Sequence, residues 1–181
     1  MDAHRDVPVA LPDGFQLDDD GLERRVSWRW FSWYAMRGII FAAIFSVPFA
    51  FVLYAYVNSP DKSWPAPALA ITLLLALPAA ATIYGWLAYL VNRTTVRVDA
   101  ARVSVRHGPL PWLGAKDVAK ADIDGVVSER VINDSSDGTI FQPREIYLVK
   151  LMLKSGKTLS LVTGLRAPDQ ALFIEQQIRK T

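Results

Sequence analysis

Two long runs without a charged side chain constrain this chain more than any other feature of its sequence. Residues 38–57 form a run of twenty, and residues 66–91 form a run of twenty-six. A helix needs about 20 residues to cross the hydrocarbon core of a bilayer. Thirty-seven polar or mixed residues precede the first run, which fits a secretory signal peptide poorly. The runs therefore predict two transmembrane helices, over 35–57 and 66–91, joined by an extracytoplasmic loop over 58–65.

Basic residues flank this predicted hairpin asymmetrically. Arg24, Arg25, Arg29 and Arg37 lie shortly before the first run, and Arg93, Arg97, Arg102 and Arg106 lie shortly after the second. The connecting loop carries only Lys62. Positive charge accumulates on the cytoplasmic side of membrane proteins. We therefore expect a multi-pass protein of the bacterial cytoplasmic (inner) membrane with both termini in the cytoplasm. The arginines placed to contact lipid head groups are Arg37, Arg93, Arg97, Arg102 and Arg106.

Aromatic and small side chains accompany the two runs. Aromatic residues near the run ends predict belts at the membrane interface, made by Trp33, Tyr34, Trp64, Trp86 and Tyr89. Small residues recur at four-residue spacing, which lets helices approach closely. The candidate helix-packing interface comprises Gly38, Ala42, Ser46, Ala50, Ala81 and Gly85. This interface serves either packing within the hairpin or docking on another subunit.

Outside the runs, the residues alternate as in β-strands. After an acidic, proline-containing tail over 1–14, the alternation of Val26, Trp28 and Trp30 predicts a β-hairpin over 15–33 that joins the soluble domain. The alternation returns at 92 and continues through several strands of a domain over 92–181. A proline, an acid and a spaced apolar face predict a closing helix over 168–180.

The order of these segments resembles a known family. Two apolar helices are followed by TTVRVDAARVSVRHGPLPW, ADIDGVVSER, VKLMLKSGKTLSLVTGL and the helix PDQALFIEQQI. This order is similar to membrane-anchored bacterial proteins with a pleckstrin-homology-like (PH-like) domain, which are largely of unknown function. The resemblance implies an α+β membrane protein: a two-helix transmembrane hairpin plus a cytoplasmic antiparallel β domain closed by a C-terminal helix. It brings no site residues.

Two loops bear on what such a domain binds. Phosphoinositide-binding relatives gather basic residues between their first two strands, but the loop here is Asp99-Ala100-Ala101, which argues against inositol-lipid recognition. The long polar loop over 133–143 carries an apolar tip at Ile140 and Phe141, the candidate residues for contact with a partner.

Catalytic chemistry has little support in the sequence. There is no cysteine, and the two histidines, His4 and His107, lack converging ligands; we interpret His107 as an ordinary surface residue. No phosphate-binding or dinucleotide-binding motif is present. We therefore expect no catalytic, cofactor-binding or metal-binding residues, no nucleic-acid partner and no small-molecule substrate. An enzyme using Asp122, Asp124 or Glu129 is the weakest of three hypotheses.

The first hypothesis is a non-enzymatic accessory or stabilising subunit of a larger membrane protein complex. Its partners would be membrane lipids and other membrane protein subunits. Energy-transducing assemblies, photosynthetic or respiratory, are where small subunits of this kind are most often found. The second hypothesis is a stand-alone, membrane-tethered PH-like module that binds anionic lipid or a peptide.

Overall fold

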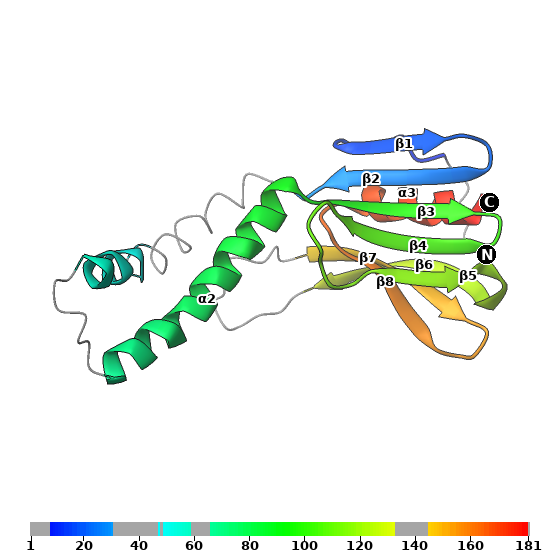
Figure 1. Ribbon diagram of the computed structural model, residues 1–181. Helices are drawn as coiled ribbons and strands as arrows, with labels where there is room; N and C mark the ends of the chain where they lie inside the picture. Colours follow the sequence, from blue (N-terminus) through cyan, green and yellow to red (C-terminus); the bar gives the residue numbers. More distant parts are fainter. Residues whose placement is uncertain (1–7, 31–46, 48, 59–65, 133–144, 181) are drawn as a thin grey trace. The chain divides into compact units, whose positions relative to one another are not determined.

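The computed structural model describes residues 8–30, 47, 49–58, 66–132 and 145–180, and Figure 1 shows their arrangement. The chain forms two compact units. One combines Met1–Arg29 with Arg93–Thr181 and is rich in β-structure, and the other is the helical segment Trp30–Asn92. The helical segment is thus inserted into the chain of the β unit.

Five antiparallel strands form the first sheet of the β unit, in the order β1-β2-β3-β4-β5 (Figure 1). Their bounds are β1 Phe15–Asp19, β2 Glu23–Arg29, β3 Arg93–Asp99, β4 Arg102–Gly108 and β5 Lys116–Ala119. Strands β2 and β3 are neighbours although the whole helical unit separates them in sequence.

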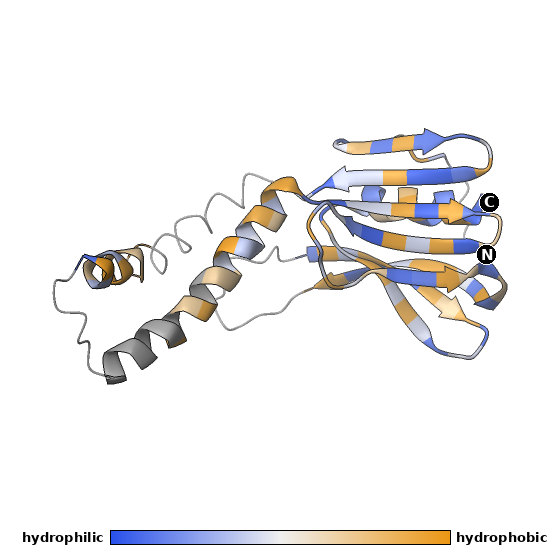
Figure 2. Ribbon diagram, in the orientation of Figure 1, coloured by the Kyte–Doolittle hydropathy of each residue, from blue (hydrophilic) through white to orange (hydrophobic). Residues whose placement is uncertain are grey.

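The alternation of apolar and polar residues explains why these segments are strands with one buried face. Val26, Val96 and Val105 lie opposite one another across β2, β3 and β4, and each is almost completely buried. Figure 2 shows apolar and polar residues alternating along these strands. A slip of one residue would turn every valine to solvent, so the burial of this face fixes the register.

A second sheet of three antiparallel strands completes the β unit, in the order β6-β7-β8. Their bounds are β6 Ile123–Ile132, β7 Glu145–Leu153 and β8 Thr158–Leu165, and a 3-10 turn over Lys120–Asp122 leads from β5 into β6. Gly156 has φ of 80° in the turn between β7 and β8, a conformation that glycine adopts without strain.

Helix α3, Pro168–Arg179, closes the β unit and is seen behind β2 and β3 in Figure 1. It starts with a proline followed by Asp169, which suits the positive end of the helix dipole. Its buried face includes Phe173, Ile174 and Ile178, and the Phe173 ring meets the Phe15 ring edge-on at 6.4 Å between centroids. The helix and both sheets therefore share one core.

Lys116 ties the two sheets together at another point. It lies on β5 opposite Val105, on the face that carries the core valines. Its ammonium donates to the carbonyls of Ser160 and Leu161 on β8. An apolar side chain at this position could not satisfy those two carbonyl groups.

The helical unit contains α2, Ala66–Val91, and a helical stretch that includes residues 49–57. The two ends of the unit meet, because the Trp30 N–H donates to the Asn92 carbonyl at 3.2 Å. The Tyr89 ring lies near the Trp30 ring, at 6.3 Å, and near the Trp86 ring, at 6.2 Å. These aromatic contacts hold the base of α2 beside the point where the chain enters the unit.

The prediction of a two-helix transmembrane hairpin is wrong for the residues that the structure describes. Among them, no helix combines the length and the hydropathy that a bilayer crossing requires.

This finding also corrects the predictions that depended on the hairpin. The fold class of an α+β membrane protein, the transmembrane keywords and the multi-pass location in the bacterial inner membrane with both termini cytoplasmic are not supported. The asymmetry of the arginines, read from the sequence as a signal of topology, belongs in the structure largely to the strands of the β unit.

We predict that Leu151→Ala destabilises the β unit by about 2–5 kcal/mol, because Leu151 is fully buried on β7 and its loss leaves a cavity in the shared core. Met152→Ala is the matched control. Met152 is the next residue on the same strand and is 41% exposed, so its truncation should cost less than about 1 kcal/mol. Urea unfolding of the two variants measures the difference, and equal losses would contradict the assignment of the core.

Candidate functional site

Arginines occupy the outer face of the five-stranded sheet. They alternate along the strands with the buried valines, so they point away from the core. The six are Arg25 and Arg29 on β2, Arg93 and Arg97 on β3, and Arg102 and Arg106 on β4. The sequence-predicted head-group candidates Arg93, Arg97, Arg102 and Arg106 are all exposed and lie together on this face, whereas Arg37 lies outside the described residues.

Three of these arginines are neutralised by acids of the same unit. Glu23 accepts from Arg25 at 2.8 Å and lies 3.7 Å from the Arg97 guanidinium. Arg102 pairs with Asp117 on β5 at 3.3 Å. Because these pairs are exposed, each contributes little to stability and serves mainly to balance charge.

The other three arginines form an unneutralised cluster. Arg29 lies opposite Arg93, and Arg106 lies opposite Thr95, two residues further along β3. None of Arg29, Arg93 and Arg106 makes an ion pair with a residue that the structure describes. We call these three residues the arginine cluster. Planar guanidinium groups in such a row suit carboxylate or phosphate oxygens.

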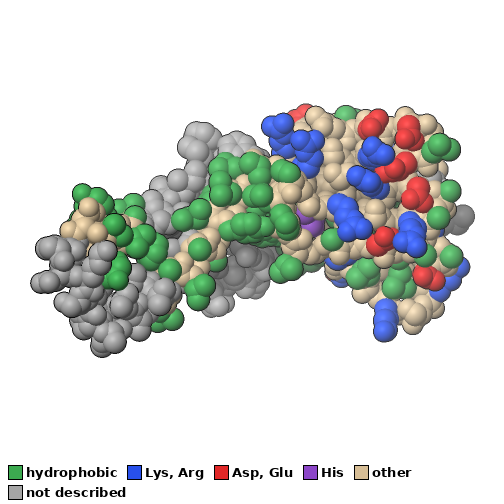
Figure 3. Space-filling view, viewed as in Figure 1, with side chains coloured by type: hydrophobic (Ala, Val, Ile, Leu, Met, Phe, Trp, Pro, Cys, Tyr) green, Lys and Arg blue, Asp and Glu red, His purple; other side chains and the backbone are tan. Residues whose placement is uncertain are grey.

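Acidic residues gather at the opposite ends of the same strands, where the turns β1–β2 and β3–β4 lie (Figure 3). The Asp20 carboxylate accepts from the backbone N–H groups of Glu23 and Leu22, which lowers the pKa of Asp20. The Asp99 carboxylate accepts from the N–H groups of Ala101 and Arg102, which lowers the pKa of Asp99 in the same way. These acids hold turns, and the sheet face is therefore basic at one end and acidic at the other.

His107 is a residue of β4 that is partly exposed and partly buried. Its Nδ1 atom lies 3.0 Å from the Thr94 hydroxyl. Burial lowers the pKa of His107, and a hydrogen bond with the Gly114 backbone opposes that shift. A neutral ring that holds Thr94 and the Gly114 turn is a structural part of the sheet. His4 lies outside the described residues.

The three acids of the enzyme hypothesis each have different surroundings. Glu129 pairs with Lys150, Asp124 is exposed, and the Asp122 carbonyl accepts from the Lys154 N–H at 2.9 Å. In the ranges that the structure covers, no three Asp, Glu or His side chains are grouped so as to hold a metal ion.

Apolar side chains are exposed on the helical unit far more than on the β unit. Of twenty large hydrophobic residues that are exposed among those described, twelve lie between 47 and 91. They are Val47, Phe51, Leu53, Tyr54, Val57, Leu74, Leu77, Ile83, Tyr84, Leu87, Leu90 and Val91. We call these twelve residues the apolar surface, and Figure 3 shows part of it over α2.

The predicted helix-packing and aromatic residues fall partly on this unit. Ala50 and Ala81 are exposed and Gly85 is partly exposed, whereas Gly38, Ala42 and Ser46 lie outside the described residues. Trp86 and Tyr89 are partly buried against each other. Trp33, Tyr34, Trp64, Ile140 and Phe141 also lie outside the described residues.

Two cations that sequence reasoning missed have unsatisfied nitrogens. Lys120 Nζ and Arg24 Nη1 are buried and have no hydrogen-bond partner among the residues that the structure describes, although the Arg24 Nε atom pairs with Asp19 at 2.8 Å. Burial lowers the pKa of Lys120. Arg24 lies opposite Val98, on the inward side of β2, so a cation at an apolar position of the strand pattern was the signal available in the sequence.

No protein family matches the chain, and no curated protein is significantly similar to it. The surfaces of the chain itself are therefore the basis for its proposed function.

We predict that acidification destabilises the β unit through His107. The pKa of His107 is lowered in the folded state, so the unfolded chain binds the proton more readily. Stability is then complete above the ordinary value of 6.5 and is lost as the pH falls from there through the folded pKa. The carboxylates with lowered pKa values act below about pH 5, so the windows separate.

Urea unfolding between about pH 5 and 7.5 tests this linkage. The wild-type chain should lose stability toward pH 5, and His107→Gln should show a flatter profile because glutamine does not titrate. Parallel profiles for the two proteins would show that His107 is not the titrating group.

Proposed function

We propose that this chain is a non-enzymatic accessory subunit that stabilises a larger protein assembly, with a PH-like β unit and a helical unit that docks on a partner. The apolar surface of the helical unit carries the proposal. Monomeric proteins rarely expose contiguous apolar patches above a few hundred Å², and larger ones usually mark interaction sites.

The composition of the helical unit supports a protein contact through packing. The runs 38–57 and 66–91 contain no charged residue, so a partner would meet no charge to desolvate there. Burying one large apolar side chain contributes roughly 1.5–3 kcal/mol. Several such residues together could outweigh the loss of translational and rotational freedom on binding, which is estimated at about 4–15 kcal/mol.

The β unit supports the PH-like part of the proposal. A five-stranded and a three-stranded antiparallel sheet pack around one core, and the C-terminal helix α3 closes it. A single fold can serve several functions, so the function depends on the surface that the molecule presents. The sheet face with basic and acidic ends would orient the subunit on a partner of complementary charge.

The arginine cluster favours one alternative: a PH-like module that binds an anionic lipid head group or an acidic peptide. Arg29, Arg93 and Arg106 have no acidic neighbour in ion-pair contact among the described residues. Each basic residue contributes on the order of 1 kcal/mol near an anionic surface.

For the accessory-subunit proposal, we predict that Ile83→Glu with Leu87→Glu releases the chain from its assembly. Both side chains are about half exposed and lie one turn apart on α2, so the change adds charge to the apolar surface without removing core residues. Affinity purification of the tagged full chain from its native cells, followed by mass spectrometry, measures the recovered partners. We expect at least a roughly tenfold loss of the partners, because buried charge without a counter-ion costs several kcal/mol.

Leu113→Glu is the matched control, because Leu113 is 91% exposed but belongs to the β unit. It should leave the recovered partners unchanged. Purification of the wild-type chain alone, without a stoichiometric partner, would refute the proposal. Equal loss with the control variant would show that the helical unit is not the docking surface.

For the alternative, we predict that replacing Arg29, Arg93 and Arg106 together by Gln weakens binding to anionic vesicles or to polyglutamate by about 100-fold. Arg130→Gln is the control, because Arg130 is exposed on the other sheet and pairs with Glu145 at 3.6 Å. Vesicles and polyglutamate are separate arms and distinguish the two ligands. If the wild-type chain binds neither, this alternative fails while the accessory-subunit proposal stands.

A further inference from the structure

An apolar loop lies at one end of the five-stranded sheet. It comprises residues 109–113, Pro-Leu-Pro-Trp-Leu, and follows β4 directly. Leu113 is 91% exposed, more than any other large hydrophobic residue that the structure describes, and Trp112 is 43% exposed. Single exposed apolar residues are common on protein surfaces, so the surroundings of this loop decide whether it has a role.

Contacts at both ends of the loop hold it at the sheet. His107, near the end of β4, forms a hydrogen bond with the backbone of Gly114, and its Nδ1 atom lies 3.0 Å from the Thr94 hydroxyl on β3. Gly114 has φ of 99°, and a Cβ atom added there would lie 3.4 Å from the His107 Nε2 atom. The loop therefore starts and ends beside the same histidine, which keeps Trp112 and Leu113 near the end of β4.

The arginine cluster lies at this same end of the sheet. Gly108, the residue before the loop, lies opposite Arg93, and Arg93 lies opposite Arg29. Arg106 is two residues before Gly108 on β4. All three arginines are exposed. One edge of the β unit therefore combines cationic groups with exposed apolar side chains.

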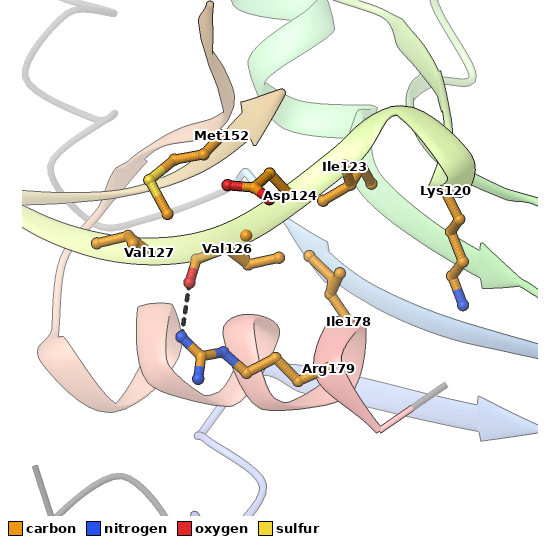
Figure 4. A pocket seen from close by; sticks show the side chains of 9 residues that line it. Lys120, Ile123, Asp124, Val126, Val127, Met152, Ile178 and Arg179 are labelled. Carbon is orange, nitrogen blue, oxygen red and sulfur yellow. Dashed lines mark hydrogen bonds between the residues drawn. The ribbon is translucent and has the colours of Figure 1, made fainter. Parts of the chain in front are cut away.

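Two arginines elsewhere in the β unit have acceptors within the protein. Arg179, which lines a cavity of about 480 Å³ beside β6, donates to the Val126 carbonyl at 2.7 Å, as Figure 4 shows, and pairs with the Glu175 carboxylate at 2.7 Å. Arg130 pairs with the Glu145 carboxylate at 3.6 Å. The arginine cluster differs because it makes no ion pair with a described residue, so its guanidinium groups are available to an external anion.

The acids of the turns lie too far away to repel such an anion strongly. Asp99 is the last residue of β3 and Arg93 is the first, and a strand of seven residues extends about 20 Å. The Debye length at physiological ionic strength is about 8 Å, so exposed charges at this separation are largely screened. The basic end therefore acts as a local positive site, although the sheet face as a whole also carries acids.

We propose that this end of the sheet binds an anionic phospholipid surface. The guanidinium groups of the arginine cluster bind lipid phosphates, and the side chains of Trp112 and Leu113 enter the boundary between the head groups and the acyl chains. A phospholipid surface provides anions and an apolar layer directly beneath them, whereas an acidic peptide provides only the anions. The combination of the loop with the cluster therefore favours lipid.

This inference rests on the alternative function proposed for the arginine cluster, and it names the ligand of that cluster. The loop belongs to the β unit and is separate from the apolar surface of the helical unit. Lipid binding by the loop and docking of a partner on the apolar surface are therefore separate events, which different measurements follow.

A single fluorescent label tests whether the loop enters lipid. The chain contains no cysteine, so Leu113→Cys in the full chain provides one site for the fluorophore nitrobenzoxadiazole. Vesicles of phosphatidylcholine and phosphatidylglycerol in equal parts should shift its emission to shorter wavelength and raise its intensity, because the label leaves water. Leu22→Cys is the matched control. Leu22 is 85% exposed but lies in the turn between β1 and β2, at the acidic end, so its label should not respond.

A second variant measures what the loop contributes to affinity. Leu113→Ser should weaken binding to the same vesicles about tenfold, because one large apolar side chain no longer leaves water. Leu22→Ser should bind them like the wild type. Neither change should alter binding to polyglutamate, which offers no apolar layer. A thermal unfolding curve checks the fold of both variants.

The outcomes separate this inference from the function on which it rests. An unresponsive label at position 113, or vesicle binding that Leu113→Ser leaves unchanged, would overturn the role of the loop. If replacement of the arginine cluster still weakens vesicle binding in that case, the alternative function stands without the loop. Wild-type chain that binds polyglutamate but not the vesicles would overturn the choice of lipid in favour of an acidic peptide.

Discussion

The antiparallel pairing of β2 with β3 is the constraint on which the rest of this structure depends. Residues that are some seventy positions apart, such as Val26 and Val96, lie opposite each other in this ladder. The whole helical unit is an insertion between the end of β2 and the start of β3. The hydrogen bond between the Trp30 N–H and the Asn92 carbonyl joins the first and last residues of this insertion.

The two units differ in how they place their apolar side chains. The β unit buries a valine-rich core and keeps its charges on the outer face, which is the usual requirement for a fold that is stable in water. The helical unit leaves its large apolar side chains exposed. The first unit is therefore complete by its own packing, and the second exposes the apolar surface on which the function that we propose is based.

Sequence periodicity accounts for part of this architecture. The alternation at Val96, Val98, Val103 and Val105 is visible without a structure, and a proline with an acid precedes a helical pattern where α3 begins. The pairing between β2 and β3 is not visible in the sequence, because the alternation within one strand does not indicate which distant strand lies beside it. The division of the strands into two sheets is likewise set by the core as a whole.

The membrane prediction failed for a related reason. Hydropathy sums the preference of side chains to leave water, but it contains no information on what they contact after they leave it. The site residues were harder still. Lys120 and Arg24 became notable only when their buried nitrogens proved to be without a partner among the described residues. A linear pattern shows each of them as an ordinary residue.

The closed base of the helical unit has a mechanical consequence. Both of its connections to the β unit lie at the same end of two neighbouring strands, so a partner that pulls on the helical unit pulls β2 and β3 in the same direction. The ladder between these two strands carries none of the relative displacement. When the pull is directed along the strands, the load passes to the ladders with β1 and β4 and acts across hydrogen bonds that run perpendicular to the strands. Many bonds then resist together instead of opening one after another, so the insertion point is built to hold under tension.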